Sequence, residues 1–447
     1  MIRRLLCAVV LVAAARTLHA EDLDRVFDRL ESNNRLRGSV AIAEGGKIVY
    51  SRAVGLRDAK TKNDATTMFR VGSVTKVFTA TLIYQLIDEK KVTLATPLNQ
   101  FFPQIPNAKQ ITIAHLLAHT SGLPNFPTPR DYADGWVLQP QTKAAMLKRF
   151  AAVTPDFAPG EKISYSNTGY VLLGYVIESV TRSTYDRQLQ KRIAKPLGLR
   201  RTRYAAAIDA RSYDFNDGKW TEHTQEDLSV SAGAGAIVST SEELARFITG
   251  VFDGRLISKT SIREMTTPFS PQLEGGERKG VVVSKLARGA DQTIYSHLGG
   301  IDAFSANLVY FPETKTAIAI TMNAQNFPMN RLFWLLTDTR LGLASQPLSF
   351  EGIAIPEATL ATYEGVYTFP QIGMDITIRR DGTQLTAQAT NQDAFAITAI
   401  APPTDRFDAL FWDRSGIVIE FRRDPNGEVS SIALFQGRGE LRFKRKP

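Results

Sequence analysis

The stretch FRVGSVTKVFTATLIYQLIDEKKV, residues 69–92, combines a polar pair with a long apolar run. Ser73 and Lys76 stand three residues apart, and apolar residues from Val77 onward recur at helical spacing. The pattern predicts a buried helix that begins near Ser73 and carries both polar side chains on one face. An unpaired buried ammonium group is costly. We therefore expect Lys76 either to have partners or to serve a chemistry that uses a lowered pKa.

The pairing of Ser73 with Lys76 suits nucleophilic catalysis. A serine hydroxyl is a weak nucleophile until a base takes its proton, and a lysine in an apolar setting becomes such a base. The helix dipole also favours negative charge in the first turn. A near-identical string, SVTR at 179–182, lacks this capacity because arginine stays protonated. The structural alternative for Ser73 and Lys76 is a helix-start serine with a lysine that extends to solvent.

A second feature is ISYSNTGYVLLGYVIE, residues 163–178. Tyr165 and Asn167 stand on a predicted loop just before a helix over Thr168–Val180. We expect a nearby lysine to favour the phenolate of Tyr165, which could then relay protons between nucleophile and leaving group. The alternative is a tyrosine that packs on its own helix and an asparagine that caps it.

A third feature is SHLGGIDAFSANLVYF, residues 296–311. His297 precedes Gly299 and Gly300 on the way into a strand, where glycines allow a backbone to approach a ligand closely. The N–H group of Gly300 could then join that of Ser73 as a pair of oxyanion donors. A histidine before glycines is otherwise a structural residue.

Strand signals at both ends of residues 21–345 surround a helical middle. A predicted helix over 21–36 precedes a hairpin that turns at Gly45–Gly46, and two strand-like runs follow at 304–311 and 316–323. Residues 231–250 pass from a glycine-rich stretch into a helix. This order predicts an α+β fold in which an antiparallel sheet, built from both ends, is flanked by helices and accompanied by a helical subdomain.

The composition changes after this region. Residues 346–357 resemble a linker, and residues 358–447 form a series of short strand-like runs separated by turn signals such as Asp381-Gly382. This pattern predicts a small antiparallel β-barrel or sandwich. Its position suggests that this domain covers one edge of a cleft or binds a cell-envelope partner.

The first twenty residues, MIRRLLCAVVLVAAARTLHA, have a basic start, an apolar stretch and a small residue at position 20. They predict a signal peptide cut near Ala20, and hence a secreted or periplasmic protein. Cys7, the one cysteine of the sequence, lies inside this segment, so the mature chain has no disulfide or cysteine nucleophile. No apolar run is long enough to span a bilayer.

The 447 residues are 43% hydrophobic and 22% charged, as in globular proteins. The formal charge of +9 falls by three, to +6, without Arg3, Arg4 and Arg16. Because the basic residues are scattered, we expect no nucleic-acid partner. The expected partner is a small-molecule or peptide substrate.

We expect no metal and no cofactor. His115 and His119 have the spacing of a ligand pair, but the glutamate of His-Glu-x-x-His and an obvious third ligand are missing. The absence of Gly-x-Ser-x-Gly argues against an α/β-hydrolase.

Together, the three features resemble the motifs of the serine β-lactamase and penicillin-recognising superfamily, close to its class C β-lactamase and esterase branch. SVTK matches its Ser-x-x-Lys motif, YSN its Tyr-x-Asn motif and HLG its third motif. The framework-like segments are HTSGLP at 119–124 and SAGAGAIVSTSEELARF at 231–247. The resemblance covers residues 21–340, and the C-terminal part is similar to small lipocalin-like domains that follow this fold.

The resemblance implies a role for each motif residue. Ser73 is the acylated nucleophile and Lys76 its base, while Tyr165 shares proton transfer and helps to activate the deacylating water. Asn167 orients Lys76 and the substrate amide.

The third motif supplies the remaining roles. His297 is expected on the sheet edge facing the cleft, where it tunes the tyrosine and binds the polar end of the substrate. Gly299 and Gly300 line the strand entrance, and Gly300 donates to the oxyanion. His297 replaces the lysine of class C β-lactamases, which argues against efficient β-lactam hydrolysis, and Ala303 replaces a frequent glycine.

The implied activity is hydrolysis of an ester or amide through a Ser73 acyl-enzyme. The substrate is a short-chain ester, a D-amino-acid peptide or a β-lactam. The alternative is a penicillin-binding or sensor module that acylates with little turnover.

Overall fold

The computed structural model describes residues 23–216, 219–273, 276–288, 290–340, 354–399, 406–408, 418–436 and 439–446. The chain forms two compact units, one of which is Leu36–Ala324, while the other holds the described residues before and after it. The predicted signal peptide and most of the predicted linker lie outside the described residues. The domain boundaries inferred from sequence stay predictions.

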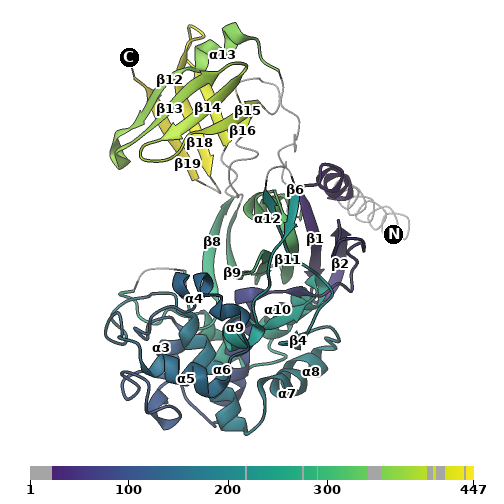
Figure 1. The fold of residues 1–447 in the computed structure, drawn as a ribbon, viewed down its shortest axis with the longest axis vertical. Helices are drawn as coiled ribbons and strands as arrows, with labels where there is room; N and C mark the ends of the chain where they lie inside the picture. Colours follow the sequence, from purple (N-terminus) through teal and green to yellow (C-terminus); the bar gives the residue numbers. More distant parts are fainter. Residues whose placement is uncertain are drawn as a thin grey trace, which may run out of the picture. The chain divides into compact units, whose positions relative to one another are not determined.

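The main sheet joins the two ends of the larger unit. Its strands run in the order β2-β1-β11-β10-β9-β8, so that β1 lies beside β11 (Figure 1). The strands are β1 Leu36–Glu44, β2 Lys47–Val54, β8 Val282–Arg288, β9 Ala290–Ile301, β10 Phe304–Phe311 and β11 Thr316–Gln325. The expected antiparallel sheet is confirmed, including the tight turn at Gly45–Gly46, where both residues have positive φ angles as a two-residue hairpin requires.

Helix α2, Thr75–Asp88, is the centre of the helical layer. Every residue from Thr75 to Leu86 is buried, which explains the apolar character on all its faces. Its Phe78 stacks on Phe247 of α10, Ser241–Phe252, with ring centroids 3.5 Å apart. Because α10 in turn packs on β1 and β10, it fills the space between α2 and the sheet.

The remaining helices of this unit build the helical subdomain and one side of the sheet. They are α3 Ile113–Leu117, α4 Pro129–Ala133, α5 Lys143–Ala151, α6 Asn167–Thr181, α7 Tyr185–Leu189, α8 Lys195–Leu197, α9 Leu228–Gly235 and α11 Lys259–Thr266. The α+β class is therefore confirmed. Helix α10 is capped by Thr240, whose side chain accepts from the Glu243 N–H.

Some predicted elements differ in extent. The first helix covers 23–32 and not 21–36, because β1 already begins at Leu36. Within the stretch expected to be mainly helical, β5, Tyr213–Asn216, begins a hairpin with β6, Lys219–Glu222. A small sheet of β3 Phe69–Arg70, β7 Ile237–Ser239 and β4 Arg203–Tyr204 was also not expected.

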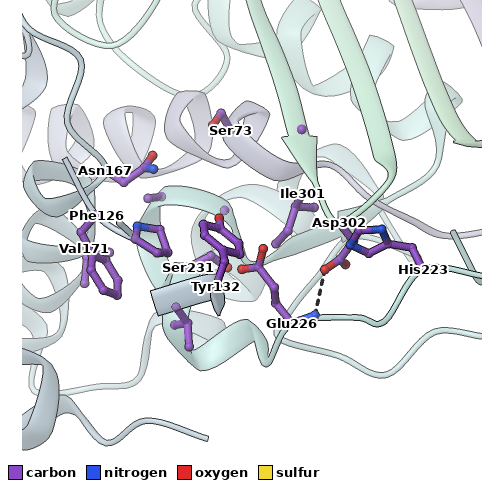
Figure 2. Close-up of a pocket in the computed structure, with 15 residues that line it drawn as sticks. Ser73, Phe126, Tyr132, Asn167, Val171, His223, Glu226, Ser231, Ile301 and Asp302 are labelled. Atoms are coloured by element: carbon purple, nitrogen blue, oxygen red, sulfur yellow. Dashed lines mark hydrogen bonds between the residues drawn. The ribbon is translucent and has the colours of Figure 1, made fainter. Parts of the chain in front are cut away.

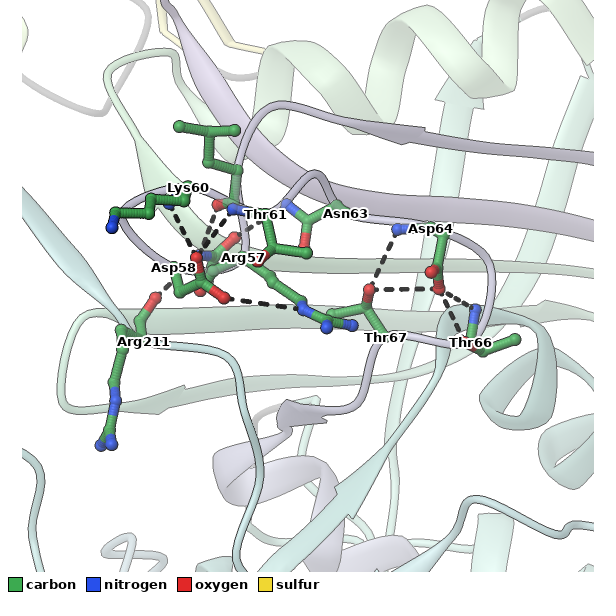
Figure 3. Close-up of polar contacts among 11 residues, drawn as sticks. Arg57, Asp58, Lys60, Thr61, Asn63, Asp64, Thr66, Thr67 and Arg211 are labelled. Carbon is green, nitrogen blue, oxygen red and sulfur yellow. Dashed lines mark hydrogen bonds and ion pairs between the residues drawn. The ribbon is translucent and has the colours of Figure 1, made fainter.

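A polar loop after β2 anchors the start of β5 (Figure 3). The Asp58 carboxylate accepts from the N–H groups of Lys60 and Thr61 at 2.8 and 2.7 Å, which forms a local turn. The Arg57 carbonyl accepts from the Arg211 N–H at 2.7 Å. Since the Asn323 side chain donates to the Arg211 carbonyl at 2.7 Å, the chain enters β5 from a position held by both the loop and the sheet.

The C-terminal residues form an antiparallel barrel in which β12 pairs with both β13 and β19. Its strands are β12 Gly365–Phe369, β13 Met374–Asp381, β14 Gln384–Ala389, β15 Phe395–Ala399, β16 Arg406–Asp408, β17 Val418–Arg423, β18 Val429–Gln436 and β19 Gly439–Arg445. Helix α13, Glu357–Tyr363, precedes the barrel in the sequence. Helix α12, Met329–Arg340, follows β11. The predicted barrel is confirmed; β12 and β16 were not predicted.

Among the described helices, none has both the length and the apolar composition needed to cross a membrane.

Candidate active site

Ser73 lies in a short 3₁₀ turn, Gly72–Val74, that continues directly into α2. This geometry places the Ser73 hydroxyl and the Lys76 amine on one face, with Oγ and Nζ 2.9 Å apart. Gly72 has a φ of +51°, and a Cβ atom there would lie 2.7 Å from the backbone of Gly300. The turn therefore requires glycine at this position, both for its conformation and for the close approach of β9.

Lys76 is fully buried, with 0% of its surface exposed. Besides Ser73, its Nζ contacts the Asn167 side-chain oxygen at 2.7 Å and the Ala234 carbonyl at 2.9 Å. Burial lowers the pKa of Lys76 well below its ordinary value, although the negative charge of Glu277 opposes this effect. The partners that the sequence argument required are thus present.

Ala234 reaches Lys76 because α9 lies unusually close to α6. A Cβ atom at Gly233 would be 2.6 Å from the Tyr170 carbonyl and 3.0 Å from Gly174. The helix is also kinked at Ala232, where φ is 38° and ψ is −131°. Neither this close approach nor the Ala234 carbonyl as a lysine partner was predicted from sequence.

Tyr165 lies on the loop before α6, and Asn167 is the first residue of that helix. Lys76 Nζ lies 4.8 Å from the centre of the Tyr165 ring, and the Tyr165 hydroxyl interacts with Ser73. Burial raises the pKa of Tyr165, and the hydrogen bond with Ser73 offsets only part of this rise. The expectation of a favoured phenolate was wrong, because the loss of solvent outweighs the nearby amine.

His119 and Asn125 hold the tyrosine loop in place. The His119 ring stacks on the Tyr165 ring with centroids 4.4 Å apart, and His119 Nδ1 accepts from the Ser166 N–H at 3.1 Å. The Asn125 side chain accepts from the Asn167 N–H at 2.9 Å. These positioning residues were not predicted, although the HTSGLP segment was noted as framework.

His115 and His119, which have the spacing of a metal-ligand pair, interact with different residues. His115 Nδ1 contacts the Thr112 side chain at 2.9 Å, where it caps α3, while His119 serves the tyrosine loop. Over the described ranges, no group of three or more His, Cys, Asp or Glu residues has a geometry that could hold a metal ion.

Gly299 and Gly300 bring β9 against the start of α2. A Cβ atom at Gly299 would lie 2.0 Å from the Val71 carbonyl oxygen and 3.2 Å from the Val74 nitrogen, so only glycine fits. Gly300 has no atom within 4 Å of such a Cβ and lines the open side. The turn that follows contains Asp302, which carries the positive φ of 54°, and Ala303.

His297 lies on β9 directly after Ser296, the last residue of that strand that pairs with β8. From His297 to Ile301 the strand pairs with β10 alone, so the expected position at an edge of the sheet agrees with the register. The side chain is 6% exposed, and its Nδ1 donates to the Leu298 carbonyl at 2.6 Å. Burial and the charge of Lys76 lower the pKa of His297 to about 4, so the ring is neutral at neutral pH. His297 does not line the cavity beside Ser73, and its expected contact with the substrate stays a prediction.

A cavity of about 370 Å³ opens onto the Ser73 hydroxyl (Figure 2). Asn167 and Gly300 also line it, whereas Lys76, Tyr165 and His297 do not. The apolar part of the lining consists of Phe126, Pro127, Val171, Val230, Ala234 and Ile301. Its volume is in the range of small-molecule sites.

The cavity also has an acidic wall that was not predicted from sequence. Glu226 and Asp302 lie there with Tyr132 and His223 (Figure 2). Asp302 Oδ1 accepts from the Glu226 N–H at 2.8 Å, and Asp302 Oδ2 pairs with Arg70 at 3.0 Å. Glu226 and Asp302 are 76 positions apart in the sequence, so no local pattern indicates this contact.

Comparison with known proteins shows what the chain resembles. The profile of the family described as Beta-lactamase matches residues 23–339, and a Domain of unknown function (DUF3471) matches residues 351–446. A relative is the teichoic acid D-alanine hydrolase of Staphylococcus aureus (strain MRSA252), 29% identical over 239 residues. This match covers 52% of the present chain and 58% of that protein.

Two solved structures extend the comparison. The D-amino acid amidase of Ochrobactrum anthropi SV3, complexed with L-phenylalanine amide, is 25% identical with a TM-score of 0.59, covering 67% of this chain and 91% of that chain. The octameric penicillin-binding protein homologue from Pyrococcus abyssi is 23% identical with a TM-score of 0.63, covering 94% and 98%. The latter similarity concerns the fold alone.

Three findings agree with one another. The family profile matches most of the chain, the fold combines a sheet with helices as in the solved structures, and a Ser-x-x-Lys pair lies beside a cavity. The chain therefore belongs to the beta-lactamase family of serine hydrolases.

Proposed function

We propose that the protein hydrolyses an ester or amide through an acyl-enzyme on Ser73, with Lys76 as the base. The observation that carries this proposal is the set of three contacts made by Lys76 Nζ, at 2.7, 2.9 and 2.9 Å. Two of these contacts are to carbonyl oxygens, Asn167 Oδ1 and the backbone oxygen of Ala234, which can accept hydrogen bonds but cannot donate them. The third ends on the hydroxyl of Ser73.

This arrangement suits a neutral amine. A neutral amine has two N–H bonds and one lone pair, whereas an ammonium has three N–H bonds and no acceptor. When the two carbonyl oxygens take both N–H bonds, the lone pair points to the Ser73 hydroxyl. The burial that lowers the pKa of Lys76 favours this form. Lys76 is thus arranged to take the Ser73 proton.

In the proposed acylation, Ser73 Oγ attacks the substrate carbonyl carbon as its proton passes to Lys76. The N–H groups of Ser73 and Gly300 stabilise the developing oxyanion. The proton reaches the leaving group through the Tyr165 hydroxyl, which adjoins Ser73. Water then attacks the ester of Ser73, with Lys76 and Tyr165 again sharing the proton.

The proposed substrates are D-aminoacyl esters, D-aminoacyl amides and short-chain esters. We expect β-lactams to be poorer substrates than these. The names of the relatives support the first two, since one is a D-alanine hydrolase and another a D-amino acid amidase. Against β-lactams, the buried and neutral His297 offers no fixed positive charge to a substrate carboxylate. We also propose that, within the family, this protein is most similar to the class C β-lactamase branch.

A second candidate is a penicillin-binding module that acylates with little turnover. The raised pKa of Tyr165 favours it, because a protonated phenol is a poor base for the deacylating water. A stopped-flow burst equal to one product per protein, followed by turnover more than about a hundredfold slower, would establish this candidate.

Labelling with a fluorophosphonate, read by intact mass, tests the proposal. We expect one adduct on the wild type, none on Ser73→Ala and a strongly reduced labelling rate for Lys76→Ala. Ser179→Ala is the matched control, because SVTR repeats the motif with an arginine and its Ser179 hydroxyl bonds to the Tyr175 carbonyl. An adduct that survives Ser73→Ala, or is lost only in Ser179→Ala, would overturn the assignment.

Export is part of the same proposal. The N-terminal sequence MIRRLLCAVVLVAAARTLHA supports cleavage near Ala20 and a secreted or periplasmic location. Expression of the full chain in a Gram-negative host, followed by N-terminal sequencing of the protein in each fraction, checks it. A full-length cytoplasmic product with an intact N-terminus would contradict export.

A further inference from the structure

We propose that the acidic wall of the cavity binds a primary ammonium group on the acyl part of the substrate, with Glu226 as the residue that determines this specificity. This inference rests on the proposed acyl-enzyme at Ser73 and assigns the residue that selects aminoacyl substrates at that site. The expected acyl group has an apolar body and a free amine, as in aminoacyl esters and amides.

The first observation is that the wall and the nucleophile share one cavity. Ser73 and Glu226 both line the space of about 370 Å³. In Figure 2 the Glu226 carboxyl group lies beside the Tyr132 ring, across the cavity from the Ser73 side chain. An acyl group attached to Ser73 would therefore extend towards the acidic wall.

The second observation is the imbalance of charge at this wall. Arg70 pairs with Asp302 at 3.0 Å and also donates to the Glu226 backbone carbonyl at 2.7 Å. Within the described part of the chain, the Glu226 carboxylate interacts with the Tyr132 hydroxyl and, at longer range, with the charges of Arg70 and His223, but it forms no ion pair. Glu226 is only 8% exposed. The wall therefore contains one buried carboxylate more than its cations neutralise.

An uncompensated buried carboxylate is costly. Burial and the negative charge of Asp302 accordingly raise the pKa of Glu226 to about 7, which means that the empty site tends to hold a proton. A substrate ammonium would supply the missing positive charge in place of that proton and would donate hydrogen bonds to the carboxylate.

The other walls indicate the rest of the ligand. Ile301 lies beside Asp302, while Phe126 and Val171 line the cavity on the side of Asn167 (Figure 2), and these apolar walls suit an apolar side chain. A divalent metal ion is a poorer fit, since the described residues contain no set of three His, Cys, Asp or Glu side chains placed to bind one. A substrate carboxylate would meet repulsion from Glu226 and Asp302.

A substrate series tests the inference on the full-length protein. D-alanine methyl ester, N-acetyl-D-alanine methyl ester and methyl propionate share the methyl propionate skeleton and differ in the α-substituent, which is an ammonium group, an uncharged acetamide and a hydrogen atom. We expect kcat/KM of the wild type to favour the free amine over both analogues by at least about tenfold. Glu226→Gln should reduce this ratio by about tenfold or more, because it keeps the shape and removes the charge.

Glu222→Gln is the matched control. It makes the same change on the exposed β6 strand, outside the cavity lining, and should leave the ratio as in the wild type. Melting temperature and fluorophosphonate labelling verify that each variant is folded. An unchanged ratio in folded Glu226→Gln, or equal rates for the amine and its N-acetyl derivative, would overturn the inference.

A measurement that needs no variant decides the matter if Glu226→Gln does not fold. Inhibition of p-nitrophenyl acetate turnover by 2-phenylethylamine is compared with that by 2-phenylethanol, which has the same shape without the charge. We expect the amine to inhibit at a concentration at least about tenfold lower. Equal inhibition with normal Ser73 labelling refutes the ammonium site alone, whereas loss of Ser73-dependent turnover refutes the proposed function and this inference together.

Discussion

The substitution Asn167→Asp places a carboxylate where the structure has a neutral oxygen, 2.7 Å from Lys76 Nζ. The side chain keeps its shape, so the change is almost purely one of charge. At this distance, and with an effective dielectric constant of about 20, the attraction between the two charges is about 6 kcal/mol. Burying the new carboxylate cancels part of that gain.

Half of this energy, about 3 kcal/mol, already changes the protonation equilibrium of Lys76 by about a hundredfold. The sign follows from linkage, since a nearby negative charge favours the ammonium and raises the pKa of Lys76. The ammonium form of Lys76 is then favoured, and acylation of Ser73 at pH 7 should fall by about a hundredfold. Activity should return as the pH rises, because the neutral amine re-forms.

The assay is p-nitrophenyl acetate turnover and fluorophosphonate labelling from pH 6 to 10. We expect the acid limb of the pH–rate profile to lie at a clearly higher pH in Asn167→Asp than in the wild type. Asn33→Asp, on an exposed residue, controls for the added charge. A variant as active as the wild type at pH 7, or one whose acid limb does not move, would refute the neutral-lysine mechanism.

Three further predictions concern stability and proton transfer. Gly299→Ala should lower the free energy of unfolding by about 1–3 kcal/mol, because its Cβ would lie 2.0 Å from a carbonyl oxygen, whereas Gly300→Ala, with open space, should leave the melting temperature nearly unchanged. Tyr165→Phe removes the hydroxyl beside Ser73 and should slow turnover by about a hundredfold; a near-normal steady-state rate would contradict its role. His297 has a lowered pKa, so its neutral form supports the fold above about pH 6.5, and this contribution is lost as the pH falls towards 4. In melting curves, His297→Asn should therefore be less acid-sensitive than the wild type over that interval, and parallel pH profiles would count against this account.

The parts of the site that depend on neighbours in sequence were predictable. Ser73 and Lys76 are one helical turn apart, so their contact follows from local geometry. The loop position of Tyr165 followed in the same way, because a run of apolar residues marks the helix that comes after it.

The parts that depend on tertiary packing were not predictable from the chain alone. The Ala234 carbonyl reaches Lys76 only because α9 is kinked at Ala232, and no local pattern announces that kink. The protonation of Tyr165 and the burial of His297 depend on solvent removed by distant segments. A one-dimensional pattern contains the residues but not the dielectric environment around them.

The fit of Gly72 and Gly299 against the facing backbone has a consequence for how this enzyme can diversify. Main chain touches main chain at the reactive side, so that side tolerates almost no variation and must be inherited as a unit. Adaptation to new substrates is left to the opposite side, where Tyr132 and Glu226, which follows the β5–β6 hairpin, line the cavity. Libraries for altered selectivity should therefore randomise that opposite side and leave both glycines untouched.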